Sequence, residues 1–278
     1  IMKLILLHLA TTLSYSVLSL VIWRQLQTVS MENQNSVRLK FWANLFTLVP
    51  IGFHFALTYQ YALVPEGLQL GLGNFTSLIV ATACLLYTCQ SLWAGKYSLP
   101  ALSLPFGAIV SLLPILDGSS VMIPNSELPM FKLHLILSTI AYGVLSVSVI
   151  HAIFISYLEK NLYRHKSSPI TSNLPPLLKL EDLLFTIVLI GFVTLTAALI
   201  SGGLISRELQ NAILPINHKI IFSFASWLLL ASLLIGQYLF GWRGKAARKI
   251  LIMGFLLLIL AYLGSRFVSE IILRNPSY

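Results

Sequence analysis

The chain has 278 residues, of which 57% are hydrophobic and only 10% are charged, and its formal net charge is +9. Soluble proteins carry about a quarter charged residues, and disordered chains need low hydrophobicity, so both classes are excluded. Two cysteines are too few for a disulfide scaffold. The composition therefore predicts a polytopic membrane protein.

Eight apolar runs follow one another along the chain, and a helix that crosses the hydrocarbon needs about 20 such residues. The fourth run is interrupted by Pro100, Pro105 and Pro114, so we expect it to be kinked or packed against protein. The connecting loops are short, which predicts an all-α polytopic helix bundle that forms a single transmembrane domain over residues 1–278. The expected spans are 4–23, 41–64, 70–92, 99–116, 133–158, 183–205, 220–241 and 250–273.

Lysine and arginine residues are divided unequally between the two sides of this bundle. Twelve lie in the loops that follow the first, third, fifth and seventh spans, and five lie on the opposite side. Because basic loops favour the cytoplasm, both termini are predicted to lie outside. The basic residues are spread over short loops that face anionic lipid, without a stripe of interleaved aromatic residues, which argues against nucleic-acid binding.

The sequence contains none of the common catalytic motifs. A P-loop and the patterns G-x-S-x-G, H-E-x-x-H and C-x-x-C are all missing, so an enzyme is not indicated. A small-molecule or ion transporter would show an internal repeat and matched broken helices, and only the fourth span is broken. A transporter and a cofactor-free membrane scaffold nevertheless remain alternatives.

Two histidines are expected at the same depth in the membrane. His134 and His218 stand at the outer starts of the fifth and seventh spans. Two imidazoles at one level on two helices suit a bis-histidine haem or another metal site, although histidines at such positions also cap helices and reach toward the interface. His54 lies deep in the second span, where polar side chains face the bundle interior, and it could form a second polar cluster with His8.

The last span carries Arg266 and Glu270, which are four residues apart and share one helix face. A mutual salt bridge is the plain interpretation of this pair. The alternative is that Arg266 meets an anionic ligand group, such as a haem propionate, near the outer interface.

Several segments resemble the cytochrome c assembly protein family, which includes CcsA, CcmC and HemX-like proteins, and within it the YpjD-type inner-membrane branch. The similarity is greatest near the C-terminus, in H-K-I-I-F-S-F-A-S-W from His218, F-G-W-R-G-K-A-A-R and L-A-Y-L-G-S-R-F-V. Further matches are G-F-H-F-A-L around His54 and L-H-L-I-L-S-T-I-A-Y-G-V-L around His134.

The resemblance implies a multi-pass inner-membrane protein of about eight helices that handles haem b at its outer face. His134 and His218 match the family's outer histidine pair, which implies that they ligate the haem iron, and His54 matches a membrane-embedded histidine. The residues expected to bind the cofactor are thus His134, His218, His54 and Arg266. Expected partners are the lipid bilayer, haem and other biogenesis proteins. The tryptophan-rich segment of CcsA-like members is replaced by S-G-G-L-I-S-R-E-L-Q-N-A-I-L-P, and the last span contains no histidine to pair with His54. These departures favour a HemX-like accessory role over haem presentation to apocytochrome c.

The charge distribution makes a topology prediction. Reporter fusions at Lys96 and Arg243 are expected to read as cytoplasmic, because both residues lie in the basic loops. A fusion after Tyr278 is expected to read as periplasmic. A cytoplasmic reading at Tyr278 would contradict the assignment.

Overall fold

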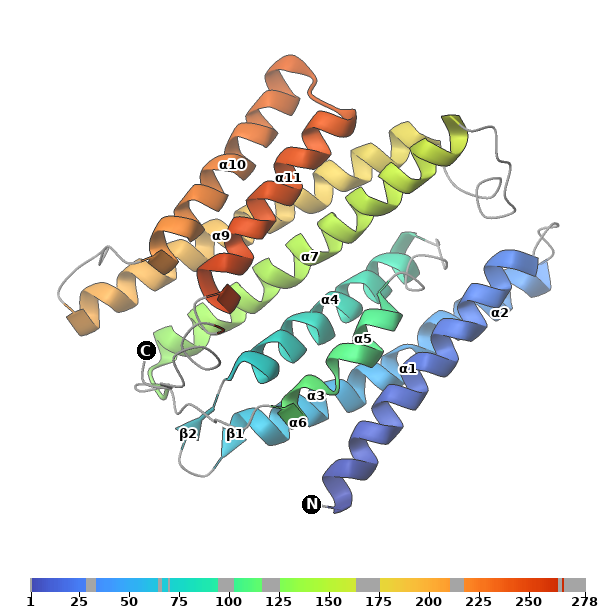
Figure 1. Cartoon of the computed structure of the whole chain (residues 1–278), viewed down its shortest axis with the longest axis horizontal. Helices are drawn as coiled ribbons and strands as arrows, with labels where there is room; N and C mark the ends of the chain where they lie inside the picture. Colours follow the sequence, from blue (N-terminus) through green and yellow to red (C-terminus); the bar gives the residue numbers. More distant parts are fainter. Residues whose placement is uncertain are drawn as a thin grey trace.

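A computed structural model describes residues 2–28, 34–64, 67–69, 71–94, 103–116, 126–163, 176–210, 218–264 and 267. Nearly all of them are helical, and the helices run roughly alongside one another (Figure 1). In chain order the elements are α1 (Met2–Thr28), α2 (Gln34–Phe46), α3 (Leu48–Ala62), β1 (Leu63–Val64), β2 (Gly67–Leu68), α4 (Leu72–Ala94), α5 (Leu104–Val110), α6 (Leu113–Leu116), α7 (Pro129–Tyr163), α9 (Leu177–Gln210), α10 (His218–Phe240), α11 (Gly244–Ile259) and the π-helix η2 (Leu260–Gly264).

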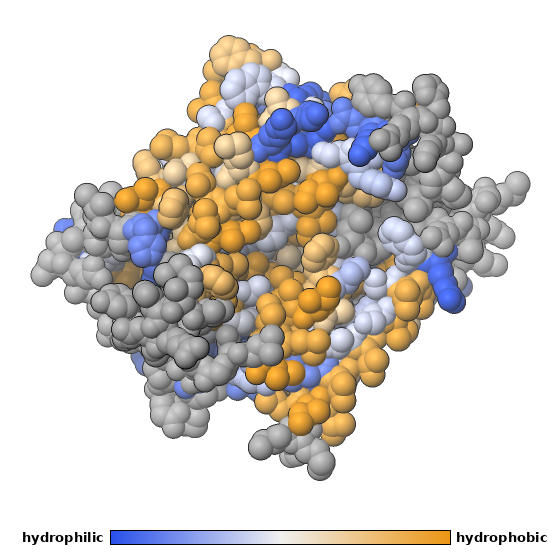
Figure 2. Space-filling model, in the orientation of Figure 1, coloured by the Kyte–Doolittle hydropathy of each residue, from blue (hydrophilic) through white to orange (hydrophobic). Residues whose placement is uncertain are grey.

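The predicted fold class is confirmed. Seven helical segments in the described ranges are long and apolar enough to cross a membrane. Hydrophobic side chains dominate the middle of the face shown in Figure 2, whereas hydrophilic ones gather toward its edges. β1 and β2 form one antiparallel pair of two residues each, in which Leu63 lies opposite Leu68. The chain is thus an all-α polytopic membrane bundle.

The expected fourth span forms two short helices, α5 and α6, within its described part. Pro105 lies in the first turn of α5, where a missing N–H costs no hydrogen bond. Pro114 cannot donate to the carbonyl of Val110, and its ring disfavours helical geometry at the preceding residue, so the helix is interrupted before it. Figure 1 shows that α5 and α6 still lead the chain back to the end of the bundle at which α1 begins and α7 starts.

The helices form two groups that meet where α4 packs on α7. In the first group α1, α3, α4 and α5 surround a core that includes Tyr15 and Ile51, and in the second α7, α9, α10 and α11 surround one that includes Leu145 and Leu230. Gly143 allows close packing at the junction, because a Cβ atom there would lie 3.1 Å from the Thr82 methyl group. Small residues commonly permit such approach between membrane helices.

α7 and α9 are longer than the expected spans. They contain 35 and 34 residues, and 35 residues at 1.5 Å each extend about 52 Å, well beyond the roughly 30 Å of hydrocarbon. Their ends therefore project past the apolar layer or the helices tilt. This length places charged residues such as Glu159 and Glu181 on regular helices that face one another.

Candidate functional site

His134 lies in the second turn of α7 and points at α9. Its Nδ1 is 3.0 Å from the carbonyl oxygen of Ala198 and 3.1 Å from the hydroxyl of Ser201. Because a carbonyl oxygen only accepts, the Nδ1 atom carries the hydrogen in this contact and Nε2 keeps its lone pair. The ring sits against Gly202, where a Cβ atom would lie 3.0 Å from Cε1. The imidazole is thus held in one orientation and one tautomer by α9.

His218 is the first residue of α10 and is exposed. Trp227 of α10 donates its indole N–H to Thr196 of α9 at 2.8 Å, so these two residues lie at the same height in the bundle. His218 lies nine residues before Trp227 on α10, which places it about 13 Å nearer the end of the bundle. Ser201, which contacts His134, lies five residues beyond Thr196 on α9, about 8 Å toward the same end. The two histidines therefore lie at the same end, with His218 about one helical turn farther out.

α7 and α10 are not direct neighbours along their length. Each of them packs against both α9 and α11, so these two helices lie between the ones that carry His134 and His218. Arg266, the third residue predicted for this end, lies outside the described residues. Within the described part of the chain no group of three or more His, Cys, Asp and Glu side chains converges as a metal site would. The candidate ligand set in the described residues is thus a histidine pair.

His54 and His8 lie in the other group of helices. His54 is completely buried, with Nδ1 3.2 Å from the hydroxyl of Tyr15 and Nε2 2.7 Å from the hydroxyl of Ser77. His8 lies 2.9 Å from the carbonyl oxygen of Ser111 and 3.0 Å from the hydroxyl of Tyr61. Each ring nitrogen of both histidines therefore already has a protein partner.

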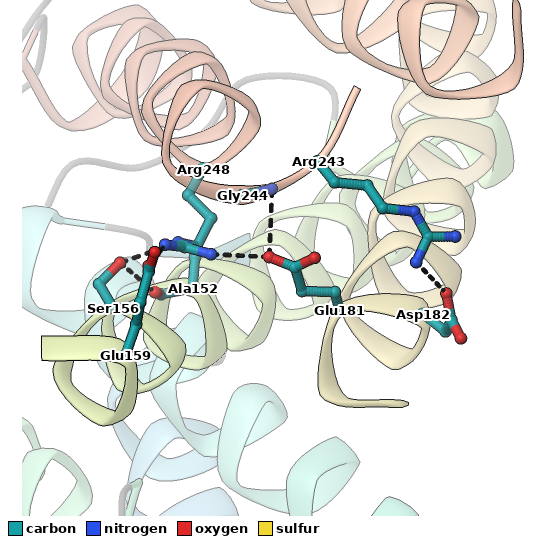
Figure 3. Close-up of polar contacts among 8 residues, drawn as sticks. All are labelled: Ala152, Ser156, Glu159, Glu181, Asp182, Arg243, Gly244 and Arg248. Carbon is teal, nitrogen blue, oxygen red and sulfur yellow. Dashed lines mark hydrogen bonds and ion pairs between the residues drawn. The ribbon is translucent and has the colours of Figure 1, made fainter. Parts of the chain in front are cut away.

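A buried charge cluster joins α7, α9 and α11 at the opposite end of the bundle (Figure 3). Arg248 of α11 is only 3% exposed. Its guanidinium donates to Glu181 of α9 at 2.8 Å, to Ser156 of α7 at 2.9 Å, and to Glu159 of α7. Glu181 also accepts from the backbone N–H of Gly244 at 3.1 Å. Every side of the guanidinium fork thus meets an acceptor, which a charge in an apolar interior requires.

The sequence alone did not predict this charge cluster. The chain has nine acidic residues in all, and Glu159, Glu181 and Asp182 fall at span ends on the side where the basic loops lie. That coincidence is the signal that would have indicated ion pairing there. The partner choice depends on tertiary packing: Arg248 is buried, whereas Arg243 pairs with Asp182 at 2.9 Å on the surface.

The fold and its histidines define a polytopic membrane protein with a candidate ligand pair at one end. A model of the family described as Cytochrome C assembly protein matches residues 42–273. The chain belongs to the cytochrome c assembly protein family, which confirms the resemblance seen in the sequence.

Two curated relatives cover most of the chain. An "Uncharacterized 28.8 kDa protein in nifR3-like 5'region" from Azospirillum brasilense is 26% identical over 243 residues, 84% of this chain and 86% of the relative. The "Inner membrane protein YpjD" of Escherichia coli K12 is 26% identical over 220 residues, 78% of this chain and 82% of the relative. A "Cytochrome c biogenesis protein CcsA" from Prochlorococcus marinus is 34% identical over 91 residues, 33% of this chain and 29% of the relative.

The buried cluster makes a stability prediction. Replacement Arg248→Met leaves Glu181 buried without its cation, and losing one partner of a buried pair costs about 3–5 kcal/mol. We expect a clear decrease in the denaturation midpoint of the purified protein in detergent, followed by circular dichroism. Arg243→Met is the matched control, because exposed pairs contribute less than about 1 kcal/mol. Equal effects of the two substitutions would contradict the assigned role of burial.

Proposed function

We propose that this protein is a multi-pass inner-membrane protein that binds haem at the outer end of its bundle and assists haem or cytochrome c biogenesis without being an enzyme itself. Family membership supports a place in cytochrome c assembly. One relative is named an inner membrane protein and another a cytochrome c biogenesis protein. The positive-inside distribution of Lys and Arg supports an outer location for the end that carries His134 and His218.

The contact between His134 and Ala198 is the observation that carries the proposal. Histidines that ligate metals usually donate their other ring N–H to a carbonyl or carboxylate, which fixes the ring and makes the ligating nitrogen more basic. His134 has this arrangement, since its Nδ1–H meets the Ala198 carbonyl at 3.0 Å. Among the described residues, the hydrogen-bond partner of Nε2 is the Ser138 hydroxyl, at a longer distance of 3.4 Å. The residue therefore fits a haem-iron ligand through Nε2.

His218 is the proposed second ligand. It is exposed at the start of α10, so its imidazole can turn toward a group held by His134 without breaking a buried contact. Arg266 is proposed to balance a propionate, and Lys132, which forms an exposed ion pair with Glu127, is a second cation at this end. The chain has no C-x-x-C motif for covalent attachment, which favours haem b. Bound haem would supply an iron centre that two neutral imidazoles hold in a low-spin state.

The proposed ligands predict a spectroscopic result. Protein purified in mild detergent and reconstituted with haem b should show a six-coordinate, low-spin visible spectrum when oxidised and when reduced. His134→Ala and His218→Ala should each abolish that low-spin spectrum, because each removes a proposed iron ligand. The His165→Ala protein should retain it, because the sequence predicts that His165, between Arg164 and Lys166, lies in the basic loop on the cytoplasmic side.

Two outcomes would contradict this site. A low-spin spectrum that persists in the doubly substituted protein would exclude the pair and direct attention to His54 and His8. Absence of any bound haem in the unsubstituted protein would favour a cofactor-free scaffold or a transporter instead, and substrate flux into proteoliposomes would test the latter.

The packing of His134 on α9 makes a finer prediction. Gly202→Ala would place a methyl group 3.0 Å from Cε1 of the imidazole, so the ring must shift by a few tenths of an ångström. We expect weaker haem binding and an altered low-spin spectrum in a protein that still folds. Gly52→Ala is the matched control, since its new methyl group would meet nothing within 4 Å. A normal spectrum and affinity in the Gly202→Ala protein would argue against ligation by His134.

A further inference from the structure

Buried polar side chains form a column through the first group of helices, away from the proposed haem site. They come from α1 to α5 and occupy successive levels between the two ends of the bundle, and all but Thr12 and Tyr61 are buried. The members are Asn44, Ser91, Thr47, Thr88, Cys84, Ser103, Tyr15, His54, Ser77, Thr12, Ser111, His8 and Tyr61.

The middle level is centred on His54. Tyr15 of α1 and Ser77 of α4 approach its two nitrogens at 3.2 and 2.7 Å. Both partners are hydroxyl groups, which donate and accept equally well. Tyr15 also contacts the Cys84 thiol, and Cys84 in turn donates to the Ser103 carbonyl at 3.6 Å. Hydrogen-bonding groups from α1, α3 and α4 therefore meet at the centre of an apolar bundle.

The upper level is centred on His8, one to two turns nearer the start of α1. Tyr61 at the end of α3 lies 3.0 Å from its Nε2, and the carbonyl of Ser111 lies 2.9 Å from its Nδ1. The hydroxyl of Ser111 lies 3.2 Å from that of Thr12. His8 is seven residues from Tyr15, about 10 Å along α1, and Thr12, at the lower edge of this level, is three residues from Tyr15, about 5 Å.

The lower level lies toward the opposite end of α4. Thr47 and Thr88 are in hydrogen-bond contact at 3.1 Å, and Ser91 donates to the side-chain oxygen of Asn44 at 3.1 Å. From Asn44 to Tyr61 the chain advances 17 residues, about 25 Å along a helix. This length is close to the roughly 30 Å of the hydrocarbon layer.

The two histidines of this column have neutral partners in the part of the chain that the structure describes. In the described residues, neither His8 nor His54 has a hydrogen bond or ion pair with an Asp, Glu, Lys or Arg side chain. A metal ion or another small cation would need such a counter-charge in an apolar interior. Polar groups inside a membrane are costly and commonly mark a pathway, and a chain of hydroxyls and imidazoles suits protons.

We propose that this column is a proton-transfer path through the N-terminal helices, with His54 as its central relay. As a proton reaches the Tyr15 hydroxyl, Tyr15 gives its own O–H proton to Nδ1, the proton on Nε2 passes to the Ser77 hydroxyl, and Ser77 releases its own O–H proton to the next polar group. The ring and both hydroxyls therefore each gain one proton and lose one. The nearest members of neighbouring levels, Thr12 and Tyr15 on α1 and Cys84 and Thr88 on α4, are three and four residues apart. This is about one helical turn, a distance that a single water molecule bridges by hydrogen bonds. The proposal does not depend on haem binding.

Proton flux into liposomes tests the path. Haem-free protein is reconstituted with a pH-sensitive dye inside the vesicles, and a potassium gradient with valinomycin makes the interior negative. The unsubstituted protein should acidify the interior faster than protein-free liposomes do. Tyr15→Phe and Ser77→Ala should each reduce the rate to that of protein-free liposomes, because each removes one hydroxyl beside His54 and little volume.

Tyr87→Phe is the matched control. Tyr87 is as fully buried as Tyr15, and its hydroxyl also lies beside a histidine Nδ1, that of His151 at 3.4 Å, but on the α4–α7 side and outside the column. This variant should conduct like the unsubstituted protein. Size-exclusion profiles and denaturation midpoints confirm that each variant is folded.

Two results would overturn the proposal. The first is a flux through the unsubstituted protein no greater than that of lipid alone. The second is a flux that Tyr15→Phe and Ser77→Ala leave unchanged, or that Tyr87→Phe lowers equally. None of these results bears on the haem spectrum, so the two proposals can fail separately.

Discussion

Every polar group that enters the hydrocarbon must find its partner inside the protein, and most of this structure follows from that constraint. Helices satisfy the backbone. Many serine and threonine side chains bond to a carbonyl one turn back in their own helix, as Thr11 does to Leu7 and Thr196 does to Phe192. Other polar side chains join helices to one another, as His54 does with Tyr15 and Arg248 does with Glu181.

The same constraint gives His134 and His54 different hydrogen-bond partners. His134 gives one nitrogen to a carbonyl of the neighbouring helix, and a ring held in this way is prepared to ligate a metal through the other. His54 has a hydroxyl at each nitrogen, which suits the passage of a proton better than a bond to iron. These different surroundings are the reason that we propose different tasks for two histidines of one membrane bundle.

Charged side chains form ion pairs at the ends of the long helices α7 and α9. α7 and α9 are longer than the hydrocarbon layer is thick. Near their ends Glu159 and Glu181 pair with Arg248, so none of these three charges faces lipid unpaired. This cluster ties α11 to α7 and α9 at the end opposite to His134 and His218. The proposed haem site lies at the other end, where His218 is exposed.

The sequence by itself determined the class of the protein and most of its spans, because hydrophobicity over about 20 residues is a local property that needs no knowledge of packing. It also placed His134 and His218 at one end of the bundle, since position along a helix follows from counting residues. Which helices are neighbours was decided only by the tertiary structure. The placement of α9 beside His134, the pairing of Arg248 with Glu181, and the meeting of His54 with Tyr15 and Ser77 join residues 23 to 67 positions apart. Helices that are apolar on every face show no preferred partner in their sequence, so side-chain packing and a few buried hydrogen bonds choose it.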